Sequence, residues 1–241
     1  MNDLQKAFGH EVMDFLNGEP AFEVIERDDG VVMLSGGPEN YFATFRRWPA
    51  PNAAPCDSFA GECLTWAAEQ GGSLCTSRSA DTRFWAWTES PLALETCRRR
   101  GARHTQEMSV YQVSKKLGMF DTILMMGANL GLLADADRGR RLLERFDRIT
   151  NPGARITGET RDPYDTDDPL HLAYHQLNRD RGRAAGQARI RVRYMNYKTP
   201  WFDYLLSSPD ELKAILEGTP WRLRRTFEAD AGTYVAIIEK K

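Results

Sequence analysis

The chain has 241 residues, of which 41% are hydrophobic and 27% charged, and its net charge is -2. This length predicts one large domain, or one domain with appendages. The small net charge excludes a global attraction for nucleic acid or an anionic membrane. No apolar run approaches the roughly 20 residues that span a bilayer, and the first residues lack the basic and apolar regions of a signal peptide. We therefore expect a cytoplasmic protein without nucleic-acid or membrane partners, acting as a monomer or homodimer.

The four cysteines indicate a reducing compartment. Cys56, Cys63, Cys75 and Cys97 lack CxxC spacing. Such spacing does not build a disulfide framework, and it disfavours a zinc site. We expect no metal.

The N-terminal part predicts a cap over residues 1–50. Apolar residues recur at helical spacing over 3–17, and residues 22–34 contain two short strand patterns around an Asp-Asp-Gly turn. A second helix should begin at Pro38 and present aromatic side chains. Tyr41 on this helix either packs against the core or lines a ligand pocket. The proline-rich residues 49–55 predict a linker into an α/β domain over 51–241.

The middle of the chain predicts helices alternating with strands. Ser90 suits the N-cap of a helix that ends near Gly101, and residues 109–113 form a weak strand pattern. Residues 120–126 form a strong buried strand that runs directly into a Gly127–Gly131 turn. A buried strand followed by such a turn is typical of parallel sheets, which present ligand-binding loops at the carboxyl ends of their strands.

The second half adds an insertion and a closing hairpin. Residues 167–207 predict a helix followed by two paired strands, inserted before the end of the domain. The other predicted elements are a helix over 135–149, a strand over 154–159, a helix over 208–218 and an antiparallel hairpin over 221–239. Alternating helices and strands that end in a hairpin predict a mostly parallel α/β sheet.

Two clusters in the insertion allow more than one interpretation. His171 and His175 lie one helical turn apart and could bind a metal, but no acidic third ligand has matching spacing, which favours solvated or hydrogen-bonded histidines. Arg189, Arg191 and Arg193 alternate with apolar residues along a strand. A basic RNA-binding strand is one interpretation, and an ordinary outer face with acidic neighbours is the favoured one.

Several segments together resemble the class I S-adenosylmethionine (SAM)-dependent methyltransferases, in particular a small bacterial group. They include GHEVMDFLNG, FEVIERDDG, GGPENYFATF, SPLALETCRRRG, FDTILMMGANLGLL, NPGARITGETRDPY and WRLRRTFEADAGTYVAIIEK, which cover most of the chain outside residues 50–88. The resemblance implies a Rossmann-like, mostly parallel seven-stranded sheet with an antiparallel C-terminal hairpin. It also implies SAM as the cofactor, bound across the carboxyl ends of strands 1, 2 and 4, and a small-molecule methyl acceptor.

The resemblance also suggests site residues. The cofactor-binding candidates are Tyr41, Trp66, Ala68, Gln70, Thr88, Glu89, Gly127 and Asn129. The substrate-binding candidates are Arg161, Tyr164 and Tyr174, and the catalytic candidates are Tyr174 and His175. An ion pair of Arg161 with Asp162 or Asp165 is an equal alternative to its role as a substrate anchor. Methyl transfer itself needs mostly proximity and orientation, with a general base in some cases.

The chain departs from the family pattern between residues 56 and 88. Such a site should contain a Gly-x-Gly-x-Gly loop after strand 1, and an acidic residue about 20 positions later that binds the ribose. The sequence has no GxGxG, and Thr88 stands where the ribose-binding acid belongs. The rival interpretation is therefore a catalytically inactive binding or scaffold protein, in which the sheet loses its first strand.

A shift of reading frame explains the missing motif. Tryptophan has a single codon, so the dipeptides Trp66-Ala67, Trp85-Ala86 and Trp87-Thr88, read two bases along, must encode Gly, Gly and Asp. Phe84-Trp85 must likewise encode Leu, and residues 64–72 permit Asp-Leu-Gly-Cys-Gly-Ala-Gly-Arg. We predict that residues 56–88 are read out of frame between two compensating shifts.

Overall fold

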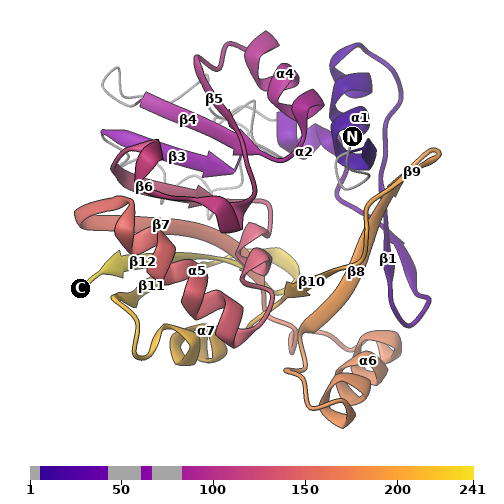
Figure 1. The fold of residues 1–241 in the computed structure, drawn as a ribbon. Coiled ribbons are helices and arrows are strands. Elements are labelled where there is room, and N and C mark those ends of the chain that lie inside the picture. Colours follow the sequence, from indigo (N-terminus) through magenta and orange to yellow (C-terminus); the bar gives the residue numbers. More distant parts are fainter. Residues whose placement is uncertain (1–5, 43–60, 67–82) are drawn as a thin grey trace.

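The computed structural model describes residues 6–42, 61–66 and 83–241, and they build two sheets (Figure 1). One sheet has seven strands and the other has five. Within these residues, no helix has the length and apolarity needed to cross a membrane. The two sheets are built from different segments of the chain. The candidate site lies at the edge of the large sheet that faces the small one.

The seven-stranded sheet confirms the predicted fold class. Its strand order is β11-β12-β7-β6-β3-β4-β5. The strands are β3 (Glu62–Trp66), β4 (Arg83–Thr88), β5 (His104–Glu107), β6 (Phe120–Met125), β7 (Thr150–Arg161), β11 (Trp221–Glu228) and β12 (Thr233–Lys240). Strands β3 to β7 pair in parallel, whereas β12 runs antiparallel between β7 and β11. The predicted closing hairpin is thus confirmed.

The central position of β3 corrects one prediction. The rival interpretation expected the sheet to lose its first strand, but β3 pairs with β4 on one side and β6 on the other. Leu64 and Trp87 are fully buried in the core together with Ile123 and Phe146. A few large side chains are enough for a short strand that is covered on both faces, so the shortage of β-branched residues did not remove it.

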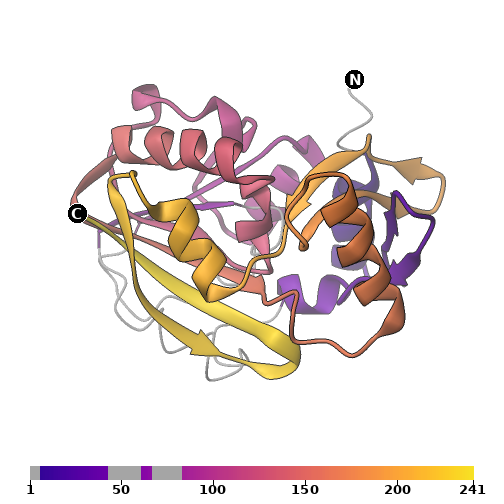
Figure 2. The same ribbon diagram turned by 90° about the horizontal axis from the view of Figure 1, so that it is seen from below.

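Apart from the first helix, whose predicted start at residue 3 lies outside the described residues, the helices begin within one residue of their predicted starts. They are α1 (Lys6–Leu16), α2 (Pro38–Phe42), α4 (Pro91–Arg99), α5 (Ala136–Arg148), α6 (Pro169–Asp180) and α7 (Pro209–Leu216). Ser90, Asp135, Asp168 and Ser208 each accept a hydrogen bond from a backbone N–H of the first turn, as N-caps do. Helices α5 and α7 cover the same face of the seven-stranded sheet (Figure 2).

The predicted strand over residues 109–113 is wrong. The edge strand is β5, which ends two residues before this segment, and Val110–Gln112 form a short 3-10 helix, η4. The Oγ atom of Ser109 accepts the N–H of Tyr111, while the Gln112 side chain accepts the N–H of Ser109 at 2.9 Å. This reciprocal cap favours a helical turn over an extended strand.

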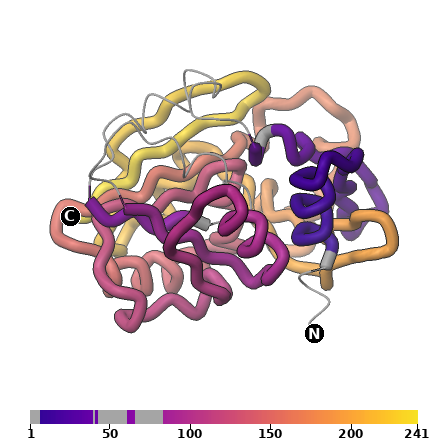
Figure 3. The backbone as a smooth tube through the Cα atoms, turned by 90° about the horizontal axis from the view of Figure 1, so that it is seen from above, coloured from indigo at the N-terminus to yellow at the C-terminus, as the bar shows by residue number. Residues whose placement is uncertain are grey.

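The five-stranded sheet joins the N-terminal hairpin to the insertion. It contains β1 (Val24–Arg27), β2 (Val32–Leu34), β8 (Gln187–Tyr194), β9 (Tyr197–Lys198) and β10 (Phe202–Leu205). Strand β1 pairs antiparallel with β8, with Ile25 opposite Val192. Figure 3 shows these segments, in indigo and orange, together at one end of the molecule. The N-terminal segment and the insertion therefore form one structural unit.

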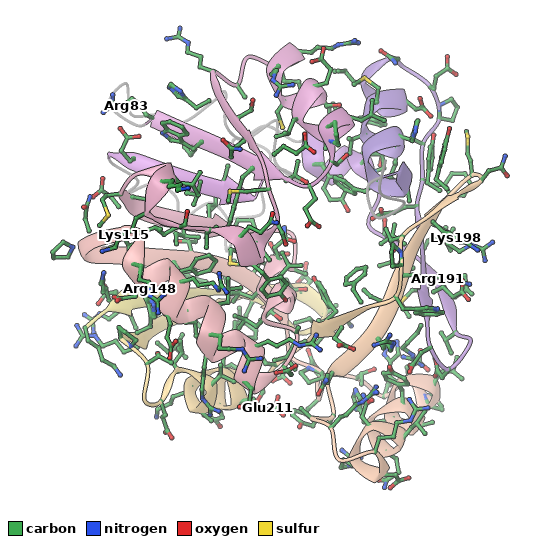
Figure 4. The ribbon with its side chains drawn as sticks, viewed as in Figure 1. Arg83, Lys115, Arg148, Arg191, Lys198 and Glu211 are labelled. Carbon is green, nitrogen blue, oxygen red and sulfur yellow. The ribbon has the colours of Figure 1, made fainter. Side chains whose placement is uncertain are left out.

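The arginines of β8 lie on an ion-paired outer face. Arg191 forms two hydrogen bonds of 2.8 Å with Glu26, and Arg193 approaches the same carboxylate at 3.3 Å. Arg189 pairs with Asp203 at 3.3 Å. Figure 4 shows Arg191 on the side of the small sheet that faces away from the large one. The acidic neighbours that the favoured interpretation of an ordinary outer face expects are present.

Candidate functional site

Three parallel strands end together at the edge that faces the small sheet (Figure 1). Trp66 at the end of β3 pairs in register with Trp87 of β4, and Leu64 pairs with Ile123 of β6. The carboxyl edge of these strands is where open α/β sheets bind ligands. Of the predicted loop residues, Ala68 and Gln70 lie outside the described residues, as does the side chain of Trp66.

The end of β4 carries Thr88 and Glu89. Thr88 is buried, and its Oγ1 atom accepts the N–H of Ser90 at 3.3 Å. Glu89 is only half-buried. Gly9 of α1 packs directly on this corner, because any Cβ at this glycine would clash with the Ser90 side chain. The corner therefore encloses the Thr88 hydroxyl and leaves Glu89 partly exposed.

A left-handed turn follows β6. Gly127 has φ of 66° and Ala128 has φ of 63°, a conformation that costs a non-glycine residue about 1 kcal/mol or more. Glu159 of β7 accepts the N–H of Ala128 at 3.1 Å, and the Tyr204 hydroxyl of β10 donates to the Ala128 carbonyl. Asn129 is buried and donates to the Met126 carbonyl at 2.7 Å. These contacts hold the turn against its strain.

Burial raises the pKa of Glu159, while the backbone N–H groups of Gly127 and Ala128 oppose the rise. Sequence reasoning missed both Glu159 and Tyr204. Glu159 ends the predicted strand 154–159, so a carboxylate next to the turn could have been suspected. Tyr204 reaches the turn from the insertion, and no local pattern in the sequence indicates this contact.

The predicted substrate residues form a second group around α6. Tyr164 is exposed and donates to Glu211 at 2.7 Å, and His175 is buried against the Tyr164 ring, with 6.1 Å between the ring centroids. Burial, followed by the charge of Arg179, lowers the pKa of His175. Arg161 is half-buried at the end of β7 and forms no ion pair with any described residue.

Tyr174 occupies a structural network in the small sheet. Its hydroxyl donates to Asp28 at 2.6 Å and accepts the N–H of Arg189 at 3.1 Å. The Arg27 guanidinium lies 4.0 Å from the centroid of its ring. Burial and the hydrogen bond to Asp28 raise the pKa of Tyr174 to about 12. None of the described contacts joins Tyr174 to the turn at Gly127.

The described residues contain no group of three His, Cys, Asp or Glu side chains able to hold a metal. His171 contacts Thr166 through Nδ1 at 3.1 Å. Cys63 and Cys97 are buried, and burial raises the pKa of the Cys63 thiol. Cys56 and Cys75 lie outside the described residues.

Tyr41 lies in the cap. Its hydroxyl donates to Glu23 at 3.0 Å, and its carbonyl accepts a hydrogen bond from Arg100. Its ring packs against the ring of Phe8, with 5.5 Å between the ring centroids. Tyr41 is half-buried, so both of its predicted roles remain compatible with its position.

Comparison with known proteins gives similarity in structure alone. No family model matches the chain, and no curated protein matches its sequence. A SAM-dependent methyltransferase from Bacteroides fragilis, in complex with S-adenosylhomocysteine, superposes with a TM-score of 0.82 at 16% identity, over 100% of this chain and 97% of its own. The CcbJ methyltransferase from Streptomyces caelestis has a TM-score of 0.55 at 12% identity, over 83% of this chain and 98% of its own.

The glycopeptide N-methyltransferase MtfA, complexed with SAM, has a TM-score of 0.53 at 10% identity, over 78% of this chain and 91% of its own. The first of these likenesses spans the small sheet as well as the large one, since it covers the whole chain. Together with the observed strand order, these similarities show that the chain has the fold of the class I SAM-dependent methyltransferases.

Proposed function

We propose that the protein transfers a methyl group from SAM to a small-molecule acceptor. The observation that carries the proposal is the meeting of the carboxyl ends of β3, β4 and β6 beside the strained turn at Gly127. Support comes from the neighbours of this fold, of which the Bacteroides fragilis protein is in complex with S-adenosylhomocysteine and MtfA with SAM.

The described residues fit such a donor. The half-buried Glu89 carboxylate is a suitable acceptor for ribose hydroxyls, and its neighbour Thr88 is enclosed by the cap of α4. At the turn of Gly127 and Ala128, the backbone reaches the same edge of the sheet, and neither residue has a large side chain. Trp66, the last residue of β3, and Ala68 and Gln70 after it remain proposed cofactor-binding residues. When bound, SAM supplies an electrophilic methyl group on a sulfonium.

The contribution of the protein itself to catalysis would be to position the donor and the acceptor. In-line methyl transfer gains most from holding donor and acceptor together, and effective molarities for well-oriented groups reach ~10⁵ M or more. The small sheet faces the donor edge, and β10 is attached to the turn through Tyr204. We assign the acceptor to this side, with Tyr41 and Arg161 as candidate contacts. The inactive-scaffold alternative has less support, because the central strand β3 is in place.

Isothermal titration of the full chain with S-adenosylhomocysteine tests the proposal. We expect a Kd on the order of 10 µM, and a roughly tenfold loss in Glu89→Ala, equivalent to about 1.4 kcal/mol. Glu107→Ala is the matched control, because Glu107 is an exposed acid on the neighbouring strand β5. Absence of binding by the folded wild-type chain would overturn the proposal.

A further inference from the structure

Strand β2 forms an open edge of the five-stranded sheet. The strands of this sheet follow the order β10-β8-β1-β2, so among the described strands β2 pairs with β1 alone. The hairpin that contains β1 lies on the far side of β8 from the large sheet (Figure 1). The open edge of a strand carries a row of backbone N–H and C=O groups, and a further strand can pair with them.

The register of the hairpin shows which backbone groups of β2 point outward. The Val31 carbonyl accepts an N–H of β1 at 2.8 Å, and the N–H of Ser35 donates to the residue before β1 at 3.2 Å. Along an antiparallel strand, residues that bond to one neighbour alternate with residues whose N–H and C=O groups face the other side. Val32 and Leu34 therefore present these groups to the open edge.

The side chains at this edge are apolar and exposed. Val32 is 55% exposed and Leu34 is 72% exposed. Both lie on the outer face of the sheet, because Val32 is the partner of Glu26 in the register and side chains alternate between faces. Phe22, which is 62% exposed, precedes the partner of Leu34 by two residues and so follows the same alternation. Exposed apolar side chains that gather at a sheet edge indicate an interaction surface.

The other sheet edges of the described chain are protected. Strand β11, at one edge of the large sheet, carries three arginines and a glutamate, and β5, at the opposite edge, has the sequence HTQE without an apolar side chain. Strand β10, at the opposite edge of the small sheet, lies against the 3-10 helix η6 (Asn129–Leu133). Residues 31–35, in contrast, contain no charge and no proline. Natural proteins charge, interrupt or cover their edge strands, so the bare edge of β2 indicates that a partner covers it.

A second copy of the chain fits this edge. With a two-fold axis at Met33, antiparallel pairing places Val32 opposite Leu34 of the partner subunit. These two residues then exchange both of their outward hydrogen bonds, and the symmetric pair does the same. The residues that meet are uncharged, so neither copy buries an unpaired charge. The joined sheet ends on each side at β10, which already lies against η6, so association stops at two copies.

We propose that the protein forms a homodimer by antiparallel pairing of β2 with β2 of a second copy. The interface consists of backbone hydrogen bonds at Val32 and Leu34, together with apolar contacts of the exposed side chains on the same face. The pairing leaves the edge of the large sheet that faces the small one free, because the hairpin lies on the far side of β8. The dimer therefore does not depend on the methyl transfer proposed above.

Sedimentation velocity of the full chain, from about 1 to 200 µM at pH 7.5, tests this proposal. We expect a monomer–dimer equilibrium with a Kd on the order of 10 µM, since a single pair of strands buries a small area. Leu34→Pro removes an outward N–H and keeps the ladder to β1, so it should weaken the dimer at least tenfold. Val32→Lys places a charge at the edge and should have the same effect. Met119→Lys changes an exposed apolar residue just before β6 and should leave the Kd unchanged.

Amide hydrogen exchange followed by NMR locates the contact. The N–H groups of Val32 and Leu34 should exchange more slowly at about 200 µM than at about 1 µM. A chain that stays monomeric at 200 µM would overturn the inference and leave the edge to a different partner. A dimer that both Leu34→Pro and Val32→Lys leave intact would also overturn it, because the copies would then meet through another face. Circular dichroism confirms that each variant is folded, and Val32→Lys, at an exposed position, keeps the test valid if Leu34→Pro does not fold.

Discussion

Glu159 of β7 accepts the N–H of Ala128, in the turn that follows the neighbouring strand β6, at 3.1 Å. Ala128 is one of two consecutive residues with positive φ at the end of β6. A strained non-glycine turn persists only where its surroundings over-determine it. The carboxylate of Glu159 is thus part of what shapes the edge proposed to bind the donor.

Glu159→Ala should destabilise the chain and the site together. Removal of the carboxylate leaves the N–H of Ala128 without this acceptor, at a cost of about 1–3 kcal/mol in the free energy of unfolding. Urea denaturation measures this loss, and titration with S-adenosylhomocysteine should show weaker binding. Glu228→Ala, an exposed acid of β11, should stay within about 0.5 kcal/mol of wild type. Wild-type stability in Glu159→Ala would show that the turn does not depend on this contact.

Gly131 and Tyr204 should be coupled. Any Cβ at Gly131 would occupy the space of the Tyr204 ring, whose hydroxyl holds the Ala128 carbonyl. We expect Gly131→Ala to displace the ring and to cost about 1–3 kcal/mol of stability. In a Tyr204→Ala background the same change should cost less, since the clash is gone. A double-mutant cycle by urea denaturation gives the coupling energy, and strict additivity would contradict this contact.

Local signals in the sequence predicted most elements and their order. Caps such as Ser90 and Asp168 fixed helix starts because the relevant hydrogen bonds lie within three residues. β5 was missed because His104–Glu107 is a polar edge strand with no apolar alternation. The contacts that define the site, such as Tyr204 with Ala128, join residues far apart in the chain. Periodicity within a helix or strand carries no information about such contacts.

The burial of Glu11 is another feature that periodicity within one helix does not predict. The helical pattern of Phe8, Val12 and Phe15 defines an apolar face, and Glu11 only borders this face, three residues after Phe8 and four before Phe15. The structure covers this border as well, because α1 also contacts α2 and β8. A helix that is covered from several directions buries residues that a single-face pattern leaves exposed.

Tyr174→Phe should reduce stability and leave donor binding intact. Its hydroxyl joins Asp28 to the N–H of Arg189, so the substitution leaves both groups without this partner. We expect a loss of about 1–3 kcal/mol in the free energy of unfolding, with the Kd for S-adenosylhomocysteine unchanged. Tyr197→Phe is the control, since the Tyr197 hydroxyl makes no hydrogen bond with the described residues. A weaker Kd without loss of stability would instead place Tyr174 in the site.

Stability should decline with rising pH because of Glu11. Its pKa is raised in the folded state from 4.5 to about 9, so the folded chain retains a proton that the unfolded chain releases. This contribution is fully present below pH 4.5, falls as the pH rises from about 4.5, and is lost by about pH 9. The groups around Glu11 that also titrate or carry charge are Glu23, Glu39, Tyr41, Asp14, Tyr194, His10 and Arg100.

Glu11→Gln should flatten this decline. The amide cannot ionise, so the difference in proton uptake between the folded and unfolded chains disappears at this position. Thermal unfolding at pH 5, 7 and 9 should give a smaller drop for the variant than for wild type, while Glu19→Gln should follow wild type. An equal drop in Glu11→Gln would show that another of the groups around it controls the pH dependence.

Replacement of the segment at the end of β3 by the sequence of the alternative reading frame should strengthen binding of the methyl donor. The end of β3 is the position at which methyltransferases of this fold would carry the glycine loop, and residues 64–72 permit Asp-Leu-Gly-Cys-Gly-Ala-Gly-Arg in the alternative frame. A chain with that segment in place of residues 64–71 should bind S-adenosylhomocysteine at least tenfold more tightly, because glycines let backbone N–H groups approach the ligand. The same segment with its three glycines replaced by alanine is the control. Sequencing of the gene gives an independent test, since codons unable to yield Gly-x-Gly-x-Gly two bases along would refute the frame shift.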